Sequence, residues 1–548
     1  MAESESESVV AASKREKNSG ALSVASLILL IGAVLQIVRI CHVESNDGKL
    51  PFLSANDRSR WCTIESLCTT GSYEIDHFIF ADEKQLKRTG WYSIDLVRHR
   101  GNDGLLHYYS SKPPLLPTLY AGVYCSVRAC TGWNLTEQPF LVARSMLVLV
   151  NVVPLFVFFW FVLRWMQRSM FGVGSPKGAG WAMVVLACVL AFGTFLTTFA
   201  NTLNNHLPAA ISVGLSLWCL EQILIQRSQP YWLFVLCGLF TSFGAANELP
   251  ALGWVAAAGA ALLIANPAKM LLGYVPGLVP VVAAFFGLNY LAHGEWSPAY
   301  AHRDVGATIG EFEYTLDQEF LSTEWLVEQV ETLGVDCSGQ CQVRPARREG
   351  VYELLDTENQ RQFALRVDVA NERIVVHEWG DWYDYPRSYW AGEKQGVDRG
   401  EESQGWYAFH CLIGHHGVFS LTPFWLLSVV GIGIAFIQAR SINFFRDHCL
   451  MLVLAILATS VVVIGFYLAR GLEDRNYGGV TSGFRWSFWL IPLWLWLAGF
   501  SLSKARRPWV RTLVGLLVLL SVFSASYPWG NPWTTPWPMQ LMEVTGWL

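Results

Sequence analysis

The chain has 548 residues, of which 52% are hydrophobic and only 15% are charged, and its mean hydropathy is +0.31. In soluble globular proteins about a quarter of the residues are charged, so this composition excludes that class. The net charge of −5 says little, because the distribution of Lys and Arg between loops matters more than their sum. Several apolar runs reach the roughly 20 residues that a helix needs to cross a bilayer. The sequence therefore predicts a polytopic membrane protein.

The chain begins with a charged stretch without periodicity, residues 1–20, which we expect to be a disordered cytoplasmic tail. The apolar run that follows, 21–43, is longer than the core of a signal peptide and has no small-residue cleavage site behind it. It is predicted to be an uncleaved first span. Lys14, Arg15 and Lys17 place its start in the cytoplasm.

Apolar segments recur along the rest of the chain, after a polar loop at 44–117. One segment, 113–130, follows that loop directly. The others lie at 140–163, 181–200, 207–225, 231–247, 249–265, 271–292, 417–436, 449–469, 486–503 and 510–527. The predicted domains are thus a membrane module at 21–292, a polar domain at 293–413, C-terminal membrane helices at 414–527 and an interfacial or external tail, rich in Pro and Trp, at 528–548.

The positive-inside rule decides how segment 113–130 is interpreted. If it spans the membrane, the strongly basic stretch 503–511 faces outward. If it lies along the membrane surface, every basic loop faces the cytoplasm, with Arg164, Arg168, Lys177, Arg227, Lys269, Arg440, Arg446, Lys504, Arg506 and Arg507. We therefore predict an all-α membrane protein with about eleven spans and a juxtamembrane helix. Loop 44–117 and domain 293–413 then lie on the external side of the cell membrane.

The polar domain is predicted to be small and α+β. A helix is expected over 322–334, since Ser322 is a good N-cap and Gly334 a good terminator. Strands are expected at Val351–Leu355, Phe363–Val369 and Ile374–Glu378, separated by turn residues. An aromatic stretch, 380–390, is expected to form a rim.

Twelve cysteines are scattered along the chain, and several lie in apolar spans where they act as small hydrophobic residues. Cys337 with Cys341, or Cys62 with Cys68, are candidates for disulfides or ligands. Neither pair has the spacing of a zinc site, so we predict no structural metal. No cofactor is predicted either, and metal dependence stays open.

Asp57 lies in NDRSRWCTIESLCTTG, where apolar and polar residues recur at three- and four-residue steps. This pattern predicts a short helix opened by Asn56 or Asp57 and closed by Gly71. Asp57 is then either a helix cap paired with Arg60, or a general base at the mouth of a membrane pocket.

Lys112 lies in SSKPP, before an apolar segment. The two prolines that follow fix the backbone and hold the ammonium group at the interface. Lys112 is then either a lysine that extends from a segment end toward water, or a fixed cation for a lipid phosphate.

Together these motifs resemble the type C membrane glycosyltransferases. Asp57-x-x-Arg60-Trp61 after the first span, followed by Lys112-Pro113-Pro114-Leu115, is similar to the branch with protein O-mannosyltransferases and bacterial aminoarabinose transferases. Those families read D-E-x-R-Y and E-K-P-P-L at these places. Beyond about residue 200 the resemblance concerns architecture only.

The resemblance implies transfer of a sugar from a polyprenyl-phosphate donor to an acceptor on the outer face, usually with inversion at the anomeric carbon. Asp57 would deprotonate the acceptor. Lys112 would bind the donor phosphate and stabilise the leaving group, and Arg60 would assist with the phosphate or orient Asp57. The implied partners are this lipid donor, a glycan, lipid or protein acceptor of the cell envelope and the bilayer, with no nucleic acid.

Two positions depart from the family pattern, because Arg58 and Ser111 stand where the families often have acidic residues. The second carboxylate is therefore missing from its expected place. Candidates to replace it are Glu65, Glu74, Asp76 and Glu248.

Further polar residues fall at the outer ends of predicted spans, where polar groups at membrane depth are costly. Asn205 and His206 either bind sugar hydroxyls or begin a helix before Pro208, and Glu248 is either an acceptor contact or a paired structural charge. Arg485, near Tyr477, either reaches the donor phosphate or anchors the chain at the interface. His415 and His416 are a weak candidate for metal binding.

We therefore predict a membrane glycosyltransferase that uses a polyprenyl-phosphate-linked sugar. The alternatives are a polytopic transporter or lipid flippase, and a ligase or polymerase of lipid-linked glycans. Transporters tend to show paired repeats or interrupted helices in both halves, and no such repeat is evident in the sequence.

Overall fold

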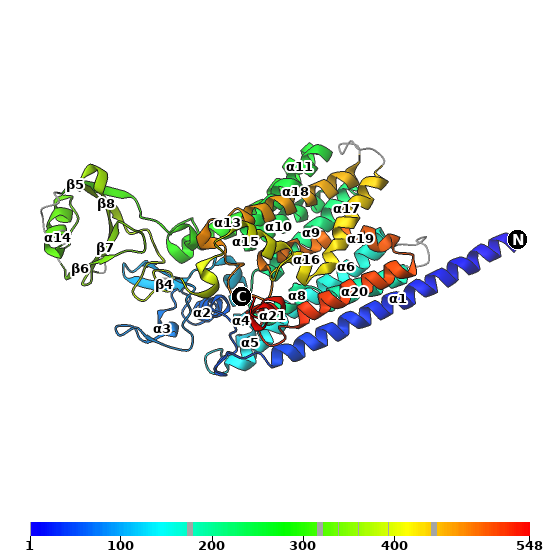
Figure 1. Ribbon diagram of the computed structural model, residues 1–548, viewed down its shortest axis with the longest axis horizontal. Helices are drawn as coiled ribbons and strands as arrows, with labels where there is room; N and C mark the ends of the chain where they lie inside the picture. The colour runs from blue at the N-terminus through cyan, green and yellow to red at the C-terminus, as the bar shows by residue number, and fades with distance from the viewer. Residues whose placement is uncertain are drawn as a thin grey trace. The chain divides into compact units, whose positions relative to one another are not determined.

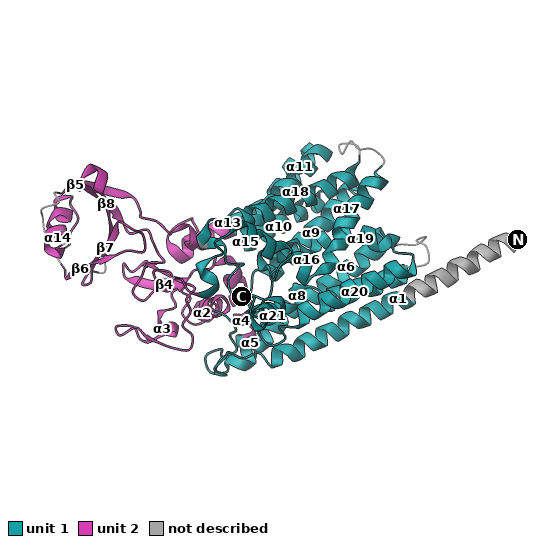
Figure 2. Cartoon of the chain, viewed as in Figure 1, with its two compact units in different colours: residues 1–54, 128–284, 396–548 teal, residues 55–127, 285–395 magenta. Residues whose placement is uncertain are grey.

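The structure is a computed structural model that describes residues 2–171, 179–314, 322–337, 339–359, 361–392, 394–439 and 447–547 (Figure 1), without the side chains of 2–19 and 473. Since residues 2–19 are described without side chains, nearly all of the predicted tail at 1–20 lies outside the part of the chain whose side chains are described. The chain divides into two compact units (Figure 2). Unit 1 comprises Met1–Ser54, Arg128–Ala284 and Gly396–Leu548, and unit 2 comprises Ala55–Val127 and Phe285–Gln395.

Unit 1 is helical. Its helices are α1 (Ala2–Cys41), α5 (Pro139–Leu147), α6 (Val153–Ser169), α7 (Ala179–Phe192), α8 (Phe195–Thr198), α9 (His206–Leu224), α10 (Tyr231–Asn247), α11 (Leu252–Ala265), α12 (Pro267–Lys269), α13 (Val275–His293, which continues into unit 2), α15 (Gln404–Leu412), α16 (Val418–Leu421), α17 (Leu426–Gln438), α18 (His448–Leu468), α19 (Ile491–Lys504), α20 (Pro508–Ser526) and α21 (Trp537–Val544).

These helices confirm the predicted fold class. Among the described residues, eight helical segments are long and apolar enough to cross a membrane, and three shorter apolar helices lie at Tyr231–Asn247, Leu249–Ala265 and Pro423–Gln438. All eleven coincide with predicted spans. The protein is a multi-pass membrane protein with a small sheet domain.

Burial separates inner from outer helices of unit 1. In the most apolar 18-residue stretch of Ala179–Asn201, 83% of the stretch is buried. In the corresponding stretches of Gly20–Cys41 and Pro267–His293, only 22% is buried. Exposed leucines on the outer helices, such as Leu30 and Leu272, suit contact with lipid. Small residues let the helices approach closely, since a Cβ atom at Gly238 of α10 would meet the carbonyl oxygen of Tyr274.

Unit 2 combines two segments distant in sequence. The first contains α2 (Ala55–Thr69), α3 (Asp76–Ile79), the strands β1 (Phe80–Asp82), β2 (Lys87–Arg88), β3 (Leu96–Arg100) and β4 (Leu106–Ser110), and most of α4 (Leu115–Thr131). The second contains β5 (Thr308–Glu313), α14 (Thr323–Thr332), β6 (Cys341–Pro345), β7 (Val351–Asp356), β8 (Arg361–Asp368) and β9 (Arg373–Glu378). The helix α4, expected to lie along the membrane surface, is not among the described helices long and apolar enough to span.

The second segment of unit 2 forms an antiparallel sheet whose described strands have the order β5-β9-β8-β7-β6. Leu326 and Val330 of α14 pack with Leu354 and Ile374 of the sheet in one hydrophobic core. The predicted helix and three strands are confirmed, and the Ser322 hydroxyl accepts a hydrogen bond from the Trp325 backbone N–H at 3.3 Å. The strands β5 and β6 were not predicted.

The first segment of unit 2 contains two hairpins where only a helix was predicted. The hairpins are β1–β2 and β3–β4. Tyr108 of β4 and Cys62 of α2 pack in one core with Tyr385, which comes from the aromatic stretch 380–390. Tyr385 of that stretch is therefore packed in the core against the first loop rather than at a rim.

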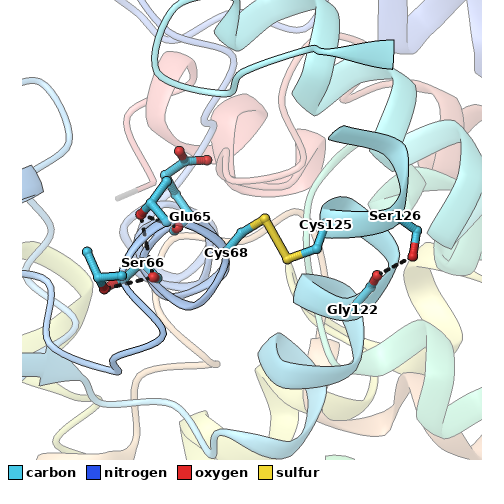
Figure 3. Close-up of a disulfide and its surroundings, with 8 residues drawn as sticks. Glu65, Ser66, Cys68, Gly122, Cys125 and Ser126 are labelled. Carbon is cyan, nitrogen blue, oxygen red and sulfur yellow. Dashed lines mark hydrogen bonds between the residues drawn. A yellow bond between two sulfur atoms is a disulfide. The ribbon is translucent and has the colours of Figure 1, made fainter. Parts of the chain in front are cut away.

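A disulfide joins α2 to α4, between Cys68 and Cys125 (Figure 3). Both predicted pairings are wrong, because Cys62, Cys337 and Cys341 are free. The bond closes a loop with a sequence separation of 57 residues. Loop-closure entropy predicts that such a cross-link stabilises the folded state by about 4 kcal/mol.

We expect Cys68→Ser to lower the free energy of unfolding of unit 2 by about 2–4 kcal/mol, because the unfolded chain regains the freedom that the bond removes. Limited proteolysis over a temperature series measures this change in detergent-solubilised protein. The control is Cys130→Ser, which removes an exposed free thiol from the same helix. Equal sensitivity of the two variants would contradict a stabilising role for the disulfide.

Candidate functional site

The helix α2 carries Asp57 in its first turn, since it begins at Ala55 rather than at the predicted Asn56 or Asp57. The Asp57 side chain is fully buried and that of Arg60 nearly so. Two hydrogen bonds hold this end of the helix. The Ser93 hydroxyl donates to the Ala55 carbonyl oxygen at 2.6 Å, and the Ser59 hydroxyl donates to the Asp95 carbonyl oxygen at 2.9 Å. A carboxylate in the first turn is favoured by the positive end of the helix dipole.

Lys112 lies just after β4 and is fixed by an ion pair. Its Nζ atom is 3.0 Å from Asp95 Oδ1, and the two side chains are 21% and 12% exposed. The Lys112 backbone N–H donates to the Ser110 hydroxyl at 3.2 Å, and that hydroxyl is hydrogen-bonded to the Ser59 hydroxyl of α2. The first turns of α2, Asp95 and Lys112 therefore form one connected network within unit 2.

Asp95 is the residue that the sequence prediction missed. It precedes β3, and its backbone oxygen contacts α2 while its carboxylate contacts Lys112. The only sequence signal is a carboxylate directly before an alternating strand pattern, LVRHR, which is weak. Asp95 thus supplies a second carboxylate near the predicted basic group, though not at the position where the resembling families have it.

The four residues predicted to replace the second carboxylate lie in different environments. Asp76 contacts His107 at 3.3 Å and accepts a hydrogen bond from the Tyr108 N–H at 3.0 Å. The Tyr109 hydroxyl donates to Glu74 at 3.4 Å. Glu65 is fully buried on α2, and Glu248 belongs to unit 1.

Burial changes the acidity of Asp76. Its side chain is 10% exposed, and desolvation raises its pKa to about 6, against the opposing effects of the Tyr108 N–H and His107. A carboxyl whose pKa is raised in the fold stabilises it at pH below about 4, and this contribution is lost as the pH rises through 6.

We expect Asp76→Asn to be more stable than the wild type above pH 6, by up to about 3 kcal/mol, and to show no such gain at pH 4. The Asn side chain keeps an acceptor for the Tyr108 N–H. Thermal unfolding in detergent at pH 4 and pH 7.5 measures the difference. Asp103→Asn is the control, because hydrogen bonds lower the pKa of that exposed carboxyl, and this variant should show no gain at pH 7.5. A gain of equal size at both pH values for Asp76→Asn would contradict desolvation as its cause.

A second polar cluster lies in unit 1 and joins four predicted residues. Asn205 Nδ2 donates to Glu248 Oε1 at 2.7 Å, and His206 Nδ1 contacts the same carboxylate. Arg485 Nη1 is 3.1 Å from His206 Nε2. Since a guanidinium group can only donate, His206 Nε2 accepts this bond and its Nδ1–H faces Glu248.

Arg485 is further fixed by its own segment, because its Nε donates to the Gly478 carbonyl oxygen at 2.7 Å and its guanidinium lies 5.2 Å from the Trp533 ring centre. Both Asn205 and His206 stand at the start of α9, as one interpretation of the sequence expects, but the Asn205 side chain makes no cap hydrogen bond. The Asn204 side chain caps instead, accepting from the Leu207 N–H at 3.0 Å.

Tyr477 points to a different group. Its hydroxyl donates to Glu401 at 3.3 Å, and its ring stacks on that of His416 at 4.5 Å. His415 is stacked on His410 at 3.8 Å. Within the described residues no group of three or more His, Cys, Asp or Glu side chains is arranged to hold a metal ion.

Comparison with known proteins gives little beyond this geometry. No protein family matches the chain, and no curated protein matches it. A solved structure of the S. cerevisiae protein O-mannosyltransferase Pmt1-Pmt2 complex bound to the sugar donor matches 96% of this chain and 92% of its own, at 11% sequence identity and a TM-score of 0.43.

Proposed function

We propose that this protein is a membrane glycosyltransferase that moves a sugar from a polyprenyl-phosphate donor to an acceptor on the external face of the cell membrane. The observation that carries the proposal is the network in unit 2. It fixes the ammonium group of Lys112 on Asp95 and joins both to the first turns of α2, which carry Asp57.

The proposed reaction needs one base and one cation. Asp57 takes the proton from the acceptor hydroxyl or amine, which then attacks the anomeric carbon of the donor. The bond between this carbon and the phosphate oxygen breaks, and its electron pair leaves with the polyprenyl phosphate. Lys112 stabilises the negative charge on that phosphate as it develops, and Arg60 orients Asp57 or assists with the phosphate.

The ion pair with Asp95 supports a binding role for Lys112 over that of a lysine free to extend to solvent. A lysine ammonium has three donor protons, and the ion pair with Asp95 Oδ1 holds it in a defined position from which it can donate to a phosphate oxygen. Its side chain remains 21% exposed, so a ligand can reach it. Asp95 positions the ammonium group in this proposal and does not touch the reacting atoms.

The cluster in unit 1 is assigned to substrate. In the proposal Arg485 binds donor phosphate, and Asn205, His206 and Glu248 bind sugar or acceptor hydroxyls. The carboxylate, imidazole and guanidinium groups hold one another in fixed orientations, which suits recognition of a polar ligand. In the proposal Tyr477 also binds substrate, from the neighbouring group in which its hydroxyl donates to Glu401 and its ring stacks on His416.

Two observations favour an external active site. The disulfide between Cys68 and Cys125 lies in the same unit as Asp57 and Lys112, and disulfides persist in oxidising compartments outside the cytosol. The basic loops between the predicted spans then face the cytoplasm, in keeping with the positive-inside rule.

The test is a transfer assay with the purified full chain in detergent. The protein is incubated with polyprenyl-phosphate sugars labelled in the sugar, together with a cell-envelope fraction. The proposal expects label to leave the lipid phase and appear in the acceptor, with polyprenyl phosphate as the other product. A flippase would leave the labelled lipid intact, and label that stays in the lipid would contradict the proposal. A ligase of lipid-linked glycans would act on preformed oligosaccharide lipids and not on the single-sugar donor.

A further inference from the structure

Unit 2 contains a cavity of about 810 Å³ that none of the roles above uses. Sites for small molecules span about 300–1,000 Å³, so this volume is large enough for a ligand of several rings. Its walls include Arg100, His293, Glu295, Arg361, Glu378 and Trp379, which come from the β3–β4 hairpin, the end of α13 and the sheet domain.

Two buried nitrogen atoms in the side chains of these walls lack partners. Within the described part of the chain, His293 Nε2 and Trp379 Nε1 make no hydrogen bond. Buried polar atoms are rarely left unpaired, since each costs about 1–3 kcal/mol. Both atoms belong to residues that line the same cavity.

The hydrogen bonds of His99 determine whether His293 Nε2 is a donor or an acceptor. Burial lowers the pKa of His99 to about 4, so its ring is neutral. Its Nδ1 is 3.0 Å from the Arg100 carbonyl oxygen and must donate, which leaves Nε2 to accept from His293 Nδ1 at 3.0 Å. A neutral His293 therefore presents an acceptor at Nε2, whereas Trp379 Nε1–H is a donor. Hydroxyl groups both donate and accept, so they match an acceptor and a donor of this kind.

The charges of the lining select against an anionic ligand. Three carboxylates, of Glu295, Asp336 and Glu378, face two guanidinium groups, of Arg100 and Arg361. Arg361 is already engaged, because its Nη1 donates to the Asp336 carbonyl oxygen at 2.7 Å. A phosphate or carboxylate ligand would meet more negative than positive charge, whereas carboxylate, guanidinium and amide groups all bind neutral hydroxyls well.

Stacking of a ligand on the Trp382 indole contributes little to recognition in this cavity. The ring of Trp382 is covered on both sides, by His302 at 3.6 Å and by His99 at 4.2 Å between ring centres. Hydrogen bonds to hydroxyls therefore contribute more to recognition than stacking on Trp382 does.

We infer that this cavity binds a neutral carbohydrate, a short oligosaccharide rich in free hydroxyl groups. Its assignment as part of the acceptor rests on the proposed function, whereas the binding itself does not. The cavity then holds the acceptor glycan through unit 2, and Asp57 acts on one hydroxyl of it or of the group that carries it.

Saturation-transfer NMR on the full chain in detergent tests this inference, with mannotriose and maltotriose as neutral probes. Mannose 6-phosphate and trialanine represent anionic and peptide ligands. We expect at least one trisaccharide to bind the wild type, and Trp379→Phe, which keeps an aromatic ring and removes the N–H, to weaken binding about tenfold. Glu378→Ala, at an exposed position, should weaken it as well. The matched control is Trp296→Phe, an exposed indole of the same unit outside the cavity lining, which should bind like the wild type.

Binding of the phosphate or the peptide without the trisaccharides would overturn the inference, and so would unchanged affinity in both cavity variants. The outcome is separable from that of the transfer assay, because saturation transfer measures binding in the absence of the lipid donor and without turnover. A protein that binds trisaccharide but never releases sugar from the lipid donor would contradict the proposed function alone. A protein that transfers sugar but binds no neutral trisaccharide would contradict the cavity assignment alone.

Discussion

Asp57→Asn is expected to lower the rate of sugar transfer by about 10²–10⁴-fold while the protein stays folded and inserted. The amide cannot accept the proton of the acceptor, but it keeps the size of the carboxylate and is well tolerated near the start of a helix. Initial rates of label transfer from the polyprenyl-phosphate donor measure the effect. Asp82→Asn is the control, since it removes a carboxylate from the same unit at β1.

Two further readouts separate lost chemistry from lost structure in Asp57→Asn. Binding of unlabelled donor lipid should be unchanged, and the disulfide between Cys68 and Cys125 should still form, as a non-reducing gel can show. Full transfer activity in this variant would remove Asp57 from the mechanism and with it the basis of the proposed reaction.

Lys112→Met is expected to lower transfer by about 10²–10³-fold, because the leaving phosphate loses a fixed positive charge in a partly buried site. Methionine keeps most of the length and apolar volume of the lysine stem. The same assay measures this loss, and donor binding should weaken together with the rate.

Removing Lys112 also leaves Asp95 without its cation, which could lower activity by disturbing the fold. The double variant Lys112→Met/Asp95→Asn distinguishes these causes, since it removes the unpaired carboxylate as well. If the cation acts on the phosphate, the double variant stays as inactive as Lys112→Met. Recovery of transfer in the double variant would show that Lys112 serves only to neutralise Asp95. Asp95→Asn alone should cost about tenfold, as the ammonium group remains but is less firmly held.

The helices were predictable from the sequence, and the sheets of unit 2 only in part. Membrane-spanning helices extend over about 20 apolar residues, so their signal is long and local. The strand β2 has two residues, Lys87–Arg88, both exposed, and carries no alternation that a pattern could detect. The strand β5 forms an edge of the sheet, and the residues that follow its described end at Glu313 carry no turn signal like those around β7 to β9.

Single residues of the site were predictable from the sequence, whereas the contacts between them were not. Asp57 and Lys112 stand in short motifs with helical spacing or paired prolines, which local rules can identify. Asp95 has no motif, and its role appears only when β3 brings it beside α2 and Lys112. The same holds for Cys125, whose partner Cys68 is 57 positions away and lies nearer in sequence to Cys62.

The polar cluster in unit 1 shows the same limit, since its members were predicted but their contacts were not. Asn205 and His206, Glu248, and Arg485 were predicted as separate candidates at outer ends of spans. The shared Glu248 carboxylate and the His206 ring connect them over nearly three hundred positions of sequence. Proximity of this kind depends on how α9, α10 and the segment before α19 pack, which no local pattern encodes.

The disulfide also makes a covalent ring of the segment from Cys68 to Cys125, which contains both hairpins, Asp95 and Lys112. A single backbone cut at the exposed turn of residues 83–86 would open the ring but leave both fragments joined through the disulfide. The turns of this ring can therefore accept cleavage or inserted residues at little cost, as exposed loop tips often do. They are suitable positions for a cleavable tag that reports which side of the membrane the ring occupies.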